Sequence, residues 1–247
     1  MKLEGKVAVI TGGGSGLGRA IALRFAEEGA RIVVAELNEI NGKETIRMVH
    51  AKGAEAFDVP TDVSKSDEVA SLFTALDDRS WPVDILVNNA GIAGILTPLH
   101  AMSDEQWDSI IQVHLNGTFY CTREAVKRML PRGSGTVINI GSVAGLRGLP
   151  GASSYTAAKG AVISLTKGVA QEYAPHGIRV NCIAPGWVET PILEHLPESM
   201  RPMMVGMTPL GRIGRPDEIA GVALFLASEE SSYMIGQTLS PNGGLHT

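Results

Sequence analysis

Short apolar runs alternate along this chain with longer stretches in which apolar residues recur every three or four positions. Continuous β-branched runs are typical of strands buried on both faces of a sheet, whereas a spacing of three or four is typical of amphipathic helices. The runs predict strands at residues 7–10, 31–35, 54–59, 83–87, 136–140, 178–183 and 238–240. The spacing predicts helices between them, at about residues 17–25, 39–51, 64–76, 107–130, 153–173 and 216–226.

Regular alternation of strands and helices implies a parallel sheet, because each connecting helix must pack on a face of that sheet. We therefore predict an α/β fold, a Rossmann-like doubly wound parallel sheet of about seven strands with helices on both faces. The length of 247 residues fits a single domain, 1–247, and no repeat or Pro/Ser-rich linker divides it. Within this domain, Ser64 and Asp67 predict a capping box at the start of the third helix.

The charge balance argues against a nucleic-acid surface. The formal net charge is −5, and no stripe rich in Lys and Arg is present to neutralise phosphates. No run approaches the ~18 apolar residues of a membrane span, and the first residues lack the pattern of a signal peptide. The two cysteines, Cys121 and Cys182, lie far apart in a predicted helix and a predicted strand. We expect a cytoplasmic protein with reduced thiols, no metal site, and neither a membrane nor a nucleic-acid partner.

A glycine-rich turn follows the first strand and opens the first helix. It has the pattern T-G-x-x-x-G-x-G, in which Gly12, Gly16 and Gly18 are interspersed with residues that include Ser15 and Leu17. Glycine lets the backbone turn tightly and approach a pyrophosphate, to which the following helix presents free N–H groups and a partial positive charge. The alternative is a tight strand–helix connection with no ligand. The position of the turn favours a dinucleotide-binding site.

Acidic residues follow the second and third strands. Glu36 ends the second strand, where a carboxylate accepts hydrogen bonds from the adenosine ribose and repels a 2′-phosphate. Neither Ser15 nor Leu37 is basic, so we expect NAD(H) to be preferred over NADP(H). Asp62 and Val63 follow the third strand and suit the adenine, although Asp62 is equally suited to a turn.

Tyr155 and Lys159 lie four residues apart on a predicted helix and therefore share one face of it. A lysine in that position favours the phenolate and is expected to lower the pKa of the tyrosine from its usual ~10. Ser142 closes the fifth strand at the carboxyl edge of the sheet, a position from which a hydroxyl can polarise a carbonyl. A Tyr-x-x-x-Lys pair arises often by chance, but its conjunction with this serine and the dinucleotide turn predicts an enzyme.

Over essentially its whole length the chain resembles the short-chain dehydrogenase/reductase family. The resemblance rests on Thr11–Gly18, Asn88–Gly91, Ser142, Tyr155, Lys159 and Pro185–Thr190, in that order. It implies that Tyr155 is the acid/base, that Ser142 orients the substrate oxygen, and that Lys159 binds the nicotinamide ribose. It further implies a homotetramer formed through the long helix and the helix at 153–173. The cofactor-binding residues that it implies are Asn89, Ala90, Gly91, Tyr155, Lys159, Pro185, Gly186, Val188 and Thr190.

One position departs from the family pattern. His114 stands where the family usually has an asparagine, and Asn116 follows two residues later. In the family this position is credited with holding a water that passes protons to the lysine. If the backbone carbonyl holds the water, His114 is a tolerated substitution; if the side chain matters, an imidazole with a pKa near ~6.5 carries protons itself. The first interpretation predicts that His114→Asn keeps turnover within about tenfold, or ~1.4 kcal/mol of barrier.

A long insertion at about residues 192–214 is expected to act as a substrate lid. We interpret it as irregular and adaptable because it is rich in methionine, although the same methionines suit an ordinary core. With other apolar residues near the active edge, it predicts a pocket for a hydrophobic secondary alcohol or ketone. The insertion contains Ile192, Leu193, Leu196, Met200, Met203, Met204, Val205, Met207 and Leu210, interspersed with Glu194, His195, Glu198 and Arg201, and the other residues are Ile92, Ile95, Leu96, Leu146 and Leu149.

Three functions are compatible with these features. The first is an NAD-dependent alcohol dehydrogenase or ketone reductase that acts on CH–OH groups of a small molecule. The second is a 3-oxoacyl-(acyl-carrier-protein) reductase that uses NADPH, with Arg128 and Arg132 as candidates for contact with an acidic carrier; Glu36 counts against it. The third is a dinucleotide sensor or scaffold without chemistry, whose mark is loss of Tyr155 or Lys159, and both are present. We therefore expect the first function.

Overall fold

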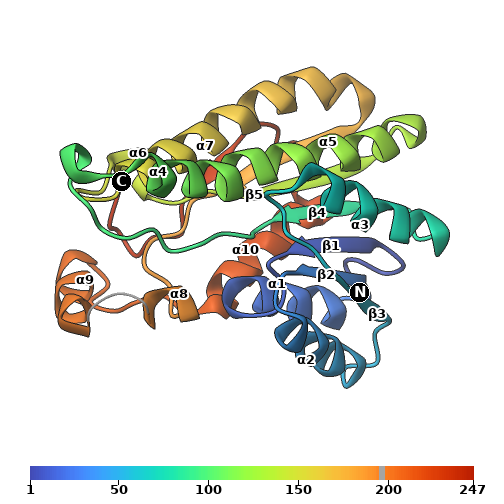
Figure 1. The fold of residues 1–247 in the computed structure, drawn as a ribbon. Coiled ribbons are helices and arrows are strands. Elements are labelled where there is room, and N and C mark those ends of the chain that lie inside the picture. Colours follow the sequence, from blue (N-terminus) through green and yellow to red (C-terminus); the bar gives the residue numbers. More distant parts are fainter. Residues whose placement is uncertain (195–197) are drawn as a thin grey trace.

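A computed structural model describes residues 1–194 and 198–247 of the protein, and in these residues seven strands form one sheet (Figure 1). Across the sheet the strands follow the order β3-β2-β1-β4-β5-β6-β7, and each neighbouring pair is parallel. Their bounds are β1 (Val7–Thr11), β2 (Arg31–Glu36), β3 (Ala56–Pro60), β4 (Ile85–Asn88), β5 (Gly135–Ile140), β6 (Ile178–Ile183) and β7 (Thr238–Leu239). The predicted doubly wound parallel sheet is confirmed.

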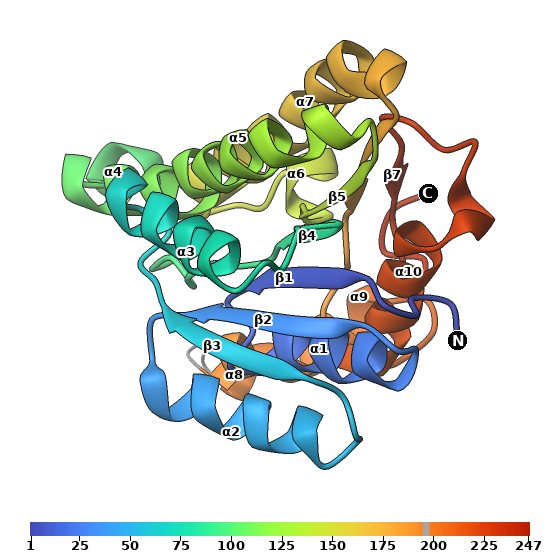
Figure 2. The same ribbon diagram turned by 90° about the vertical axis from the view of Figure 1, so that its right-hand side faces the viewer.

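Helices connect the strands. They are α1 (Gly16–Glu27), α2 (Glu39–His50), α3 (Ser66–Asp78), α4 (Asp104–Ile111), α5 (Gly117–Met129), α6 (Ala144–Arg147), α7 (Ser153–Tyr173), α8 (Pro191–Glu194), α9 (Arg201–Met207) and α10 (Pro216–Ala227). Figure 2 shows α3, α5 and α7 on one face of the sheet and α1, α2 and α10 on the other. The predicted covering of both faces is therefore confirmed.

Each face of the sheet has its own apolar core, because successive strand residues point to opposite faces. In β1, Ala8 and Ile10 belong to the cluster that contains Phe25 of α1. Val7 and Val9 belong to the opposite cluster, which contains Phe73 of α3. Burial on both faces explains why the strands appear in the sequence as continuous apolar runs.

The order of the strands locates a ligand crevice. The neighbours of β1 in the sheet are β2 on one side and β4 on the other, so the direction of winding changes at β1. In open α/β sheets, ligands bind outside the carboxyl ends of the strands at such a switch point. The glycine-rich turn after β1 and the segment after β4 meet at this edge.

The predicted helix at 107–130 is interrupted near its middle. It consists of α4, a π-helical turn at Gln112–Asn116, and α5. Ser103 and Gln106 form a capping box at the start of α4. His114 lies within the π-helical turn, and its carbonyl accepts a hydrogen bond from the Thr118 hydroxyl at 2.7 Å. Such turns occur frequently at functional sites.

The predicted capping box at Ser64 is wrong. Helix α3 begins at Ser66, and its N-cap Lys65 makes no side-chain cap bond. The Ser64 hydroxyl instead donates to the Asp62 carboxylate at 2.7 Å, and Glu68 accepts the Asp62 N–H at 2.7 Å. The Asp62 carboxylate thus binds the Ser64 hydroxyl, which the sequence pattern assigned to the helix cap.

The insertion at 192–214 is partly helical rather than irregular, since it contains most of α8 and all of α9. Met204 is 2% exposed and belongs to the core, whereas Met203 and Met207 are 45% and 39% exposed. Both interpretations of the methionines therefore hold in part. His195 and Leu196 lie outside the described residues.

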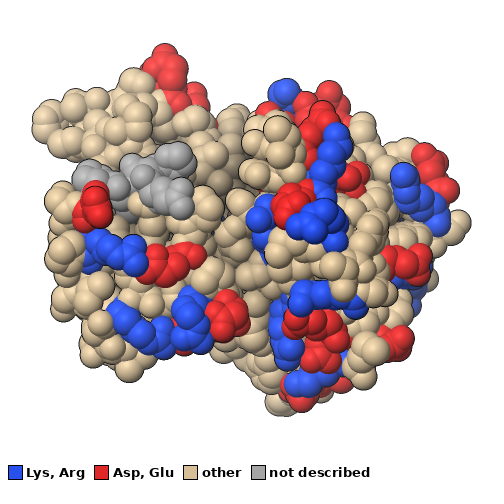
Figure 3. Space-filling view, turned by 90° about the horizontal axis from the view of Figure 1, so that it is seen from below, with Lys and Arg blue, Asp and Glu red and all other residues tan. Residues whose placement is uncertain are grey.

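Charged side chains of both signs share the surface. Figure 3 shows Lys and Arg interspersed with Asp and Glu on the face seen from below. On α2, for example, Lys43 pairs with Glu39 at 2.9 Å and Arg47 with Glu44 at 2.7 Å. In the described part of the chain, no helix has the length and apolar character to cross a membrane, and no three side chains form a metal-binding group.

Candidate active site

A cleft of about 460 Å³ lies at the carboxyl edge of the sheet. With the exception of Gly18, every site residue predicted from the sequence lines it. These residues are Gly12, Ser15, Gly16, Leu17, Glu36, Asp62, Val63, Asn89, Ala90, Gly91, His114, Ser142, Tyr155, Lys159, Pro185, Gly186, Val188 and Thr190. The fold therefore brings together residues that are spread over most of the sequence.

The glycine-rich turn depends on its glycines. Gly12 has a φ of +60°, and a Cβ there would lie 2.8 Å from the Cα of Ala90. Gly18 lies behind the turn, where a Cβ would collide with the carbonyl of Gly12. The Asn89 amide donates to the carbonyls of Thr11 and Gly12 at 2.9 and 3.0 Å and fastens the turn to the end of β4. Gly18 therefore supports the cradle and does not line it.

The start of α1 fits an anionic group. The N-cap Ser15 makes no side-chain hydrogen bond to the first turn, so its N–H groups are not capped by that side chain. These N–H groups and the helix dipole favour a phosphate at this point. Together with the bare glycine backbone, they fit the pyrophosphate of a dinucleotide.

Glu36 lies at the end of β2 beside this cradle. Its carboxylate accepts hydrogen bonds from the N–H groups of Gly14 at 2.9 Å and Asn38 at 3.0 Å. Sequence reasoning missed a nearby cation, Arg19, whose guanidinium donates to the Gly14 carbonyl and to Thr45. Arg19 does not line the cleft, so the charge presented to a ligand there is that of Glu36.

Asp62 lines the cleft and also makes a turn. Burial alone would raise the pKa of its carboxyl, but hydrogen bonds from Ser64 and the charge of Lys65 hold that pKa below its ordinary value. The carboxylate accepts the Ser64 N–H at 3.0 Å. Both roles considered for Asp62 are therefore compatible with its position.

Tyr155 and Lys159 extend from the first two turns of α7 into the cleft. The Lys159 Nζ lies 5.8 Å from the centre of the Tyr155 ring and donates to the Ile140 carbonyl at 2.6 Å. Burial lowers the pKa of Lys159 to about 8. Burial raises the pKa of Tyr155, and a hydrogen bond with Ser142 opposes that rise. The expected lowering of the tyrosine pKa by the lysine is therefore wrong.

His114 packs edge-on against Tyr155, with ring centres 5.2 Å apart. Its Nε2 lies 3.2 Å from the N–H and 3.0 Å from the carbonyl oxygen of Ile92. A Cβ at Gly91 would lie 2.6 Å from the imidazole, so this ring requires glycine there. Burial, with the charge of Lys159, lowers the pKa of His114 to about 3. The side chain is therefore neutral near pH 7, and the expected titration near ~6.5 is wrong.

Similarity to known proteins identifies the family of this chain. The chain matches the family model described as enoyl-(acyl carrier protein) reductase over residues 12–246. It is 40% identical over 245 residues to the 3-oxoacyl-(acyl-carrier-protein) reductase FabG of Thermotoga maritima, with 99% of each chain covered. The chain belongs to the short-chain dehydrogenase/reductase family. The predicted resemblance is confirmed.

Other members of the short-chain dehydrogenase/reductase family bear different names. The cis-4-hydroxycyclohexanecarboxylate dehydrogenase of Sinomonas cyclohexanicum is 39% identical over 239 residues, which is 97% of this chain and 96% of that protein. The crystal structure of a short-chain type dehydrogenase/reductase from Mycobacterium marinum has a TM-score of 0.95 and 34% identity, covering 99% of this chain and 96% of the other. Levodione reductase has the same TM-score of 0.95 with 36% identity, and 98% of each chain is covered. The protein is an oxidoreductase that binds a nicotinamide dinucleotide and acts on small molecules.

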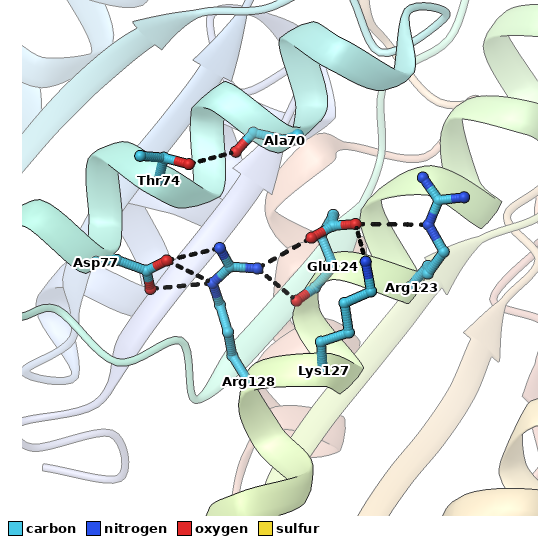
Figure 4. Close-up of polar contacts among 7 residues, drawn as sticks. All are labelled: Ala70, Thr74, Asp77, Arg123, Glu124, Lys127 and Arg128. Atoms are coloured by element: carbon cyan, nitrogen blue, oxygen red, sulfur yellow. Dashed lines mark hydrogen bonds and ion pairs between the residues drawn. The ribbon is translucent and has the colours of Figure 1, made fainter.

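The two arginines considered for carrier docking are engaged elsewhere in this family member. Figure 4 shows Arg128 of α5 between Asp77 of α3 and Glu124, with Nη2 2.6 Å from Asp77 and Nη1 3.1 Å from Glu124. Arg132 donates to Asp84 at 2.9 Å. The Arg128 pair with Asp77 joins α5 to α3, and the Arg132 pair with Asp84 joins the segment after α5 to the residue before β4. A carrier would have to displace them.

The far end of the cleft contains residues that sequence reasoning missed. Ile92, Ile95, Leu96, Leu149, Ile192, Leu193 and Met207 line it as predicted, but Leu146, Met200, Met203, Met204, Val205 and Leu210 do not. The additional lining residues include Arg147, Trp187 and Leu245. Arg147 follows Ser142 by five positions, which was the only signal in the sequence of its place near the site. Leu245 comes from the last residues of the chain, which Figure 1 shows beside α6.

Proposed function

We propose that the protein is an NAD(H)-dependent oxidoreductase that interconverts a hydrophobic secondary alcohol and its ketone. One observation carries the proposal: Tyr155, Ser142 and Lys159 share a single cleft with the glycine cradle and Glu36. A proton donor, an orienting hydroxyl and a cation thus lie beside a site whose acidic residue suits an unphosphorylated ribose. The apolar walls at the far end of the cleft support a hydrophobic substrate.

Glu36 is assigned to the hydroxyls of the adenosine ribose, and its charge opposes a 2′-phosphate. Asp62 and Val63 are assigned to the adenine, and Asn89, Ala90 and Gly91 to the cofactor along β4. Pro185, Gly186, Val188 and Thr190 are assigned to the nicotinamide end. When bound, the cofactor supplies a nicotinamide ring that accepts or donates a hydride.

Tyr155 is assigned as the acid/base. In ketone reduction its hydroxyl gives a proton to the substrate oxygen as the carbonyl carbon gains the hydride; in alcohol oxidation the phenolate takes that proton back. Burial raises the pKa of Tyr155, so its hydroxyl is protonated near neutral pH, which is the form that acts as the acid in ketone reduction. Lys159 is assigned to the nicotinamide ribose, and His114 packs edge-on against the tyrosine ring.

Ser142 is suited to orient the substrate oxygen. Its Oγ accepts the Ala144 N–H at 3.1 Å, so its own proton can be donated to the Tyr155 oxygen or to a substrate oxygen. A hydrogen bond from this hydroxyl to a carbonyl polarises the carbonyl in the same direction as the proton from Tyr155. The two hydroxyls therefore act on one oxygen.

A second candidate is a 3-oxoacyl-(acyl-carrier-protein) reductase that uses NADPH, which the 40% identity to the Thermotoga maritima enzyme favours. Glu36 opposes the phosphate of NADPH, and the ion pairs of Arg128 and Arg132 oppose carrier docking. We therefore place it second. For the assembly we propose a cytoplasmic homotetramer formed through α4, α5 and α7, on which Trp107 and Phe119 are 37% and 44% exposed.

Absorbance at 340 nm tests the proposal directly. Purified protein is assayed with NAD or NADP against a panel of secondary alcohols, and with NADH or NADPH against the matching ketones and 3-oxoacyl thioesters. We expect turnover of apolar alcohols and ketones with the unphosphorylated cofactor. Turnover of acyl thioesters with NADPH alone would select the second candidate, and nucleotide binding with no turnover would select a sensor.

A further inference from the structure

The charged residues that line the cleft are divided by sign between its two ends. Among the described residues, the acidic ones in the lining are Glu36, which ends β2, and Asp62, which follows β3. The basic ones are Arg147 and Lys159, on α6 and α7. The adenosine end is therefore acidic, and the end that holds Tyr155 is basic. This polarity favours a negatively charged substrate.

Arg147 makes fewer polar and cation–π contacts with described residues than any other arginine of the chain. Its Nη1 donates to the Leu245 carbonyl at 3.0 Å, and no other hydrogen bond of its guanidinium involves a described residue. No Asp or Glu in the described ranges lies within 4.0 Å of it, whereas Arg128 and Arg201, for instance, are held by carboxylates. Even the arginines without an acid partner are otherwise engaged: Arg19 and Arg179 bind several oxygens, and Arg31 and Arg79 lie over aromatic rings.

The single bond to Leu245 leaves one edge of the guanidinium without a partner among the described residues. Nε and Nη2 form that edge, and their parallel N–H groups match the two oxygens of a carboxylate. The bond to Leu245 and the end of α6 hold the group at the cleft. A planar, partly held fork of this kind suits a carboxylate better than a phosphate dianion, which one guanidinium does not neutralise.

We propose that Arg147 is the recognition site for a carboxylate on the substrate. The substrate then has an apolar body, a secondary alcohol or ketone at the end near Tyr155, and a carboxylate at the end near Arg147. This inference rests on the proposed function and deepens it, since it names the substrate class. Leu149 and Ile95 line the cleft with Arg147 and provide apolar surface for the body of the substrate.

The test measures binding without turnover, so that it is independent of the redox assay. Isothermal titration calorimetry compares cyclohexanecarboxylate with cyclohexanecarboxamide, which has the same shape and no charge, in the presence of NADH. The variants are Arg147→Gln, Arg147→Lys and Arg47→Gln, the last removing an exposed arginine of α2 as a matched charge control. The wild type is expected to bind the carboxylate about five- to thirtyfold more tightly than the amide, as bidentate charge-assisted hydrogen bonds at an exposed arginine allow.

Arg147→Gln is expected to abolish this preference and to leave amide binding within about twofold. Arg147→Lys should retain part of it, because the charge remains and the fork is lost. Arg47→Gln should behave as the wild type. Equal binding of both ligands to the wild type, equal weakening of both in Arg147→Gln, or no binding of either overturns the carboxylate site. Failure of the 340 nm assay with both neutral and carboxylate-bearing alcohols and ketones, in contrast, counts against the proposed function alone.

Discussion

The two ends of the cleft are built in different ways. At the adenosine end, the turn after β1 is held by backbone contacts and glycine conformations, and Glu36 and Asn89 are already bonded to the turn itself. At the substrate end, Ser142, Tyr155 and Arg147 point functional groups at the cleft with few partners of their own. Main-chain atoms form most of the adenosine end. Side chains form the substrate end, and some of their hydrogen-bonding groups have no partner among the described residues.

This difference predicts how each end responds to mutation. A change at the adenosine end disturbs the fold, because the same contacts that form the cradle also join β1 to β4. Removal of the Ser142 or Tyr155 hydroxyl or of the Arg147 guanidinium at the substrate end removes chemistry and is expected to leave the fold intact, because these groups make few contacts. Mutations at the adenosine end are therefore expected to lower stability, and mutations at the substrate end are expected to lower turnover.

The largest effect on turnover is expected from Tyr155→Phe. The change removes the hydroxyl that transfers the proton, and general acid/base catalysis of this kind contributes about 10²- to 10⁴-fold. We expect kcat to fall about 10³-fold while the Kd for NADH, measured by fluorescence titration, changes by less than about threefold. A mutant that retains a tenth of the wild-type turnover would show that Tyr155 is not the acid/base.

The next largest effect is expected on stability, from Gly18→Ala. A Cβ there meets the Gly12 carbonyl, so the turn or α1 must move, at a cost of about 3 kcal/mol in the free energy of unfolding. Gly168→Ala is the matched control, because Gly168 is an exposed residue of α7 and no atom lies within 4 Å of the position that its Cβ would take. That change is expected to be neutral or to stabilise by up to ~1 kcal/mol. Urea unfolding of both variants measures the difference, and equal midpoints would contradict the packing argument.

Glu36→Ala is expected to change cofactor preference by about tenfold or more. The change removes the acceptor for the ribose and the repulsion of a 2′-phosphate, so kcat/KM falls with NAD and rises with NADP. Glu39→Ala removes an exposed carboxylate three residues later, which pairs with Lys43, and should leave the ratio unchanged. If both variants keep the wild-type ratio of the two kcat/KM values, Glu36 does not select the cofactor.

Sequence periodicity predicted the elements of the fold well, because burial on both sheet faces produces continuous apolar strands. The helix predicted at 153–173 and the strand at 178–183 match α7 and β6 at both ends. Predictions from local sequence patterns were wrong where a second polar group binds the side chain that the pattern assigns to a helix cap. Asp62 takes the hydroxyl of Ser64, and the π-helical turn around His114 has no periodic signal of its own.

The site residues were predicted wherever a family motif or a strand end identifies them. Trp187 lies within the Pro185–Thr190 motif, but no role was assigned to it. Arg147 and Leu245 were missed, because they reach the cleft through tertiary packing of α6 and the chain end. The pKa values of Tyr155 and His114 were mispredicted for the same reason. Spacing places a lysine near a tyrosine, but only the packed structure shows that burial raises the pKa of Tyr155 and lowers that of His114.

The smallest effect on turnover, and a distinct effect of pH, is expected from His114→Asn. Because His114 is neutral and contacts Tyr155 through its ring, its loss should reduce kcat by less than about tenfold, or ~1.4 kcal/mol. A loss of several hundredfold would identify the histidine as an essential relay.

Stability as a function of pH distinguishes this histidine from the others. Its pKa is about 3 in the folded protein and near 6.5 in the unfolded chain. Between these values the unfolded chain binds the proton and the folded protein does not, so stability falls as pH decreases from 6.5 toward 3. At pH 5 the cost is about 2 kcal/mol relative to pH 7. His114→Asn should remove this part of the dependence, whereas His100→Asn, at an exposed position, should keep the wild-type slope. Identical slopes in all three proteins would mean that burial does not lower the pKa of His114 below its value in the unfolded chain.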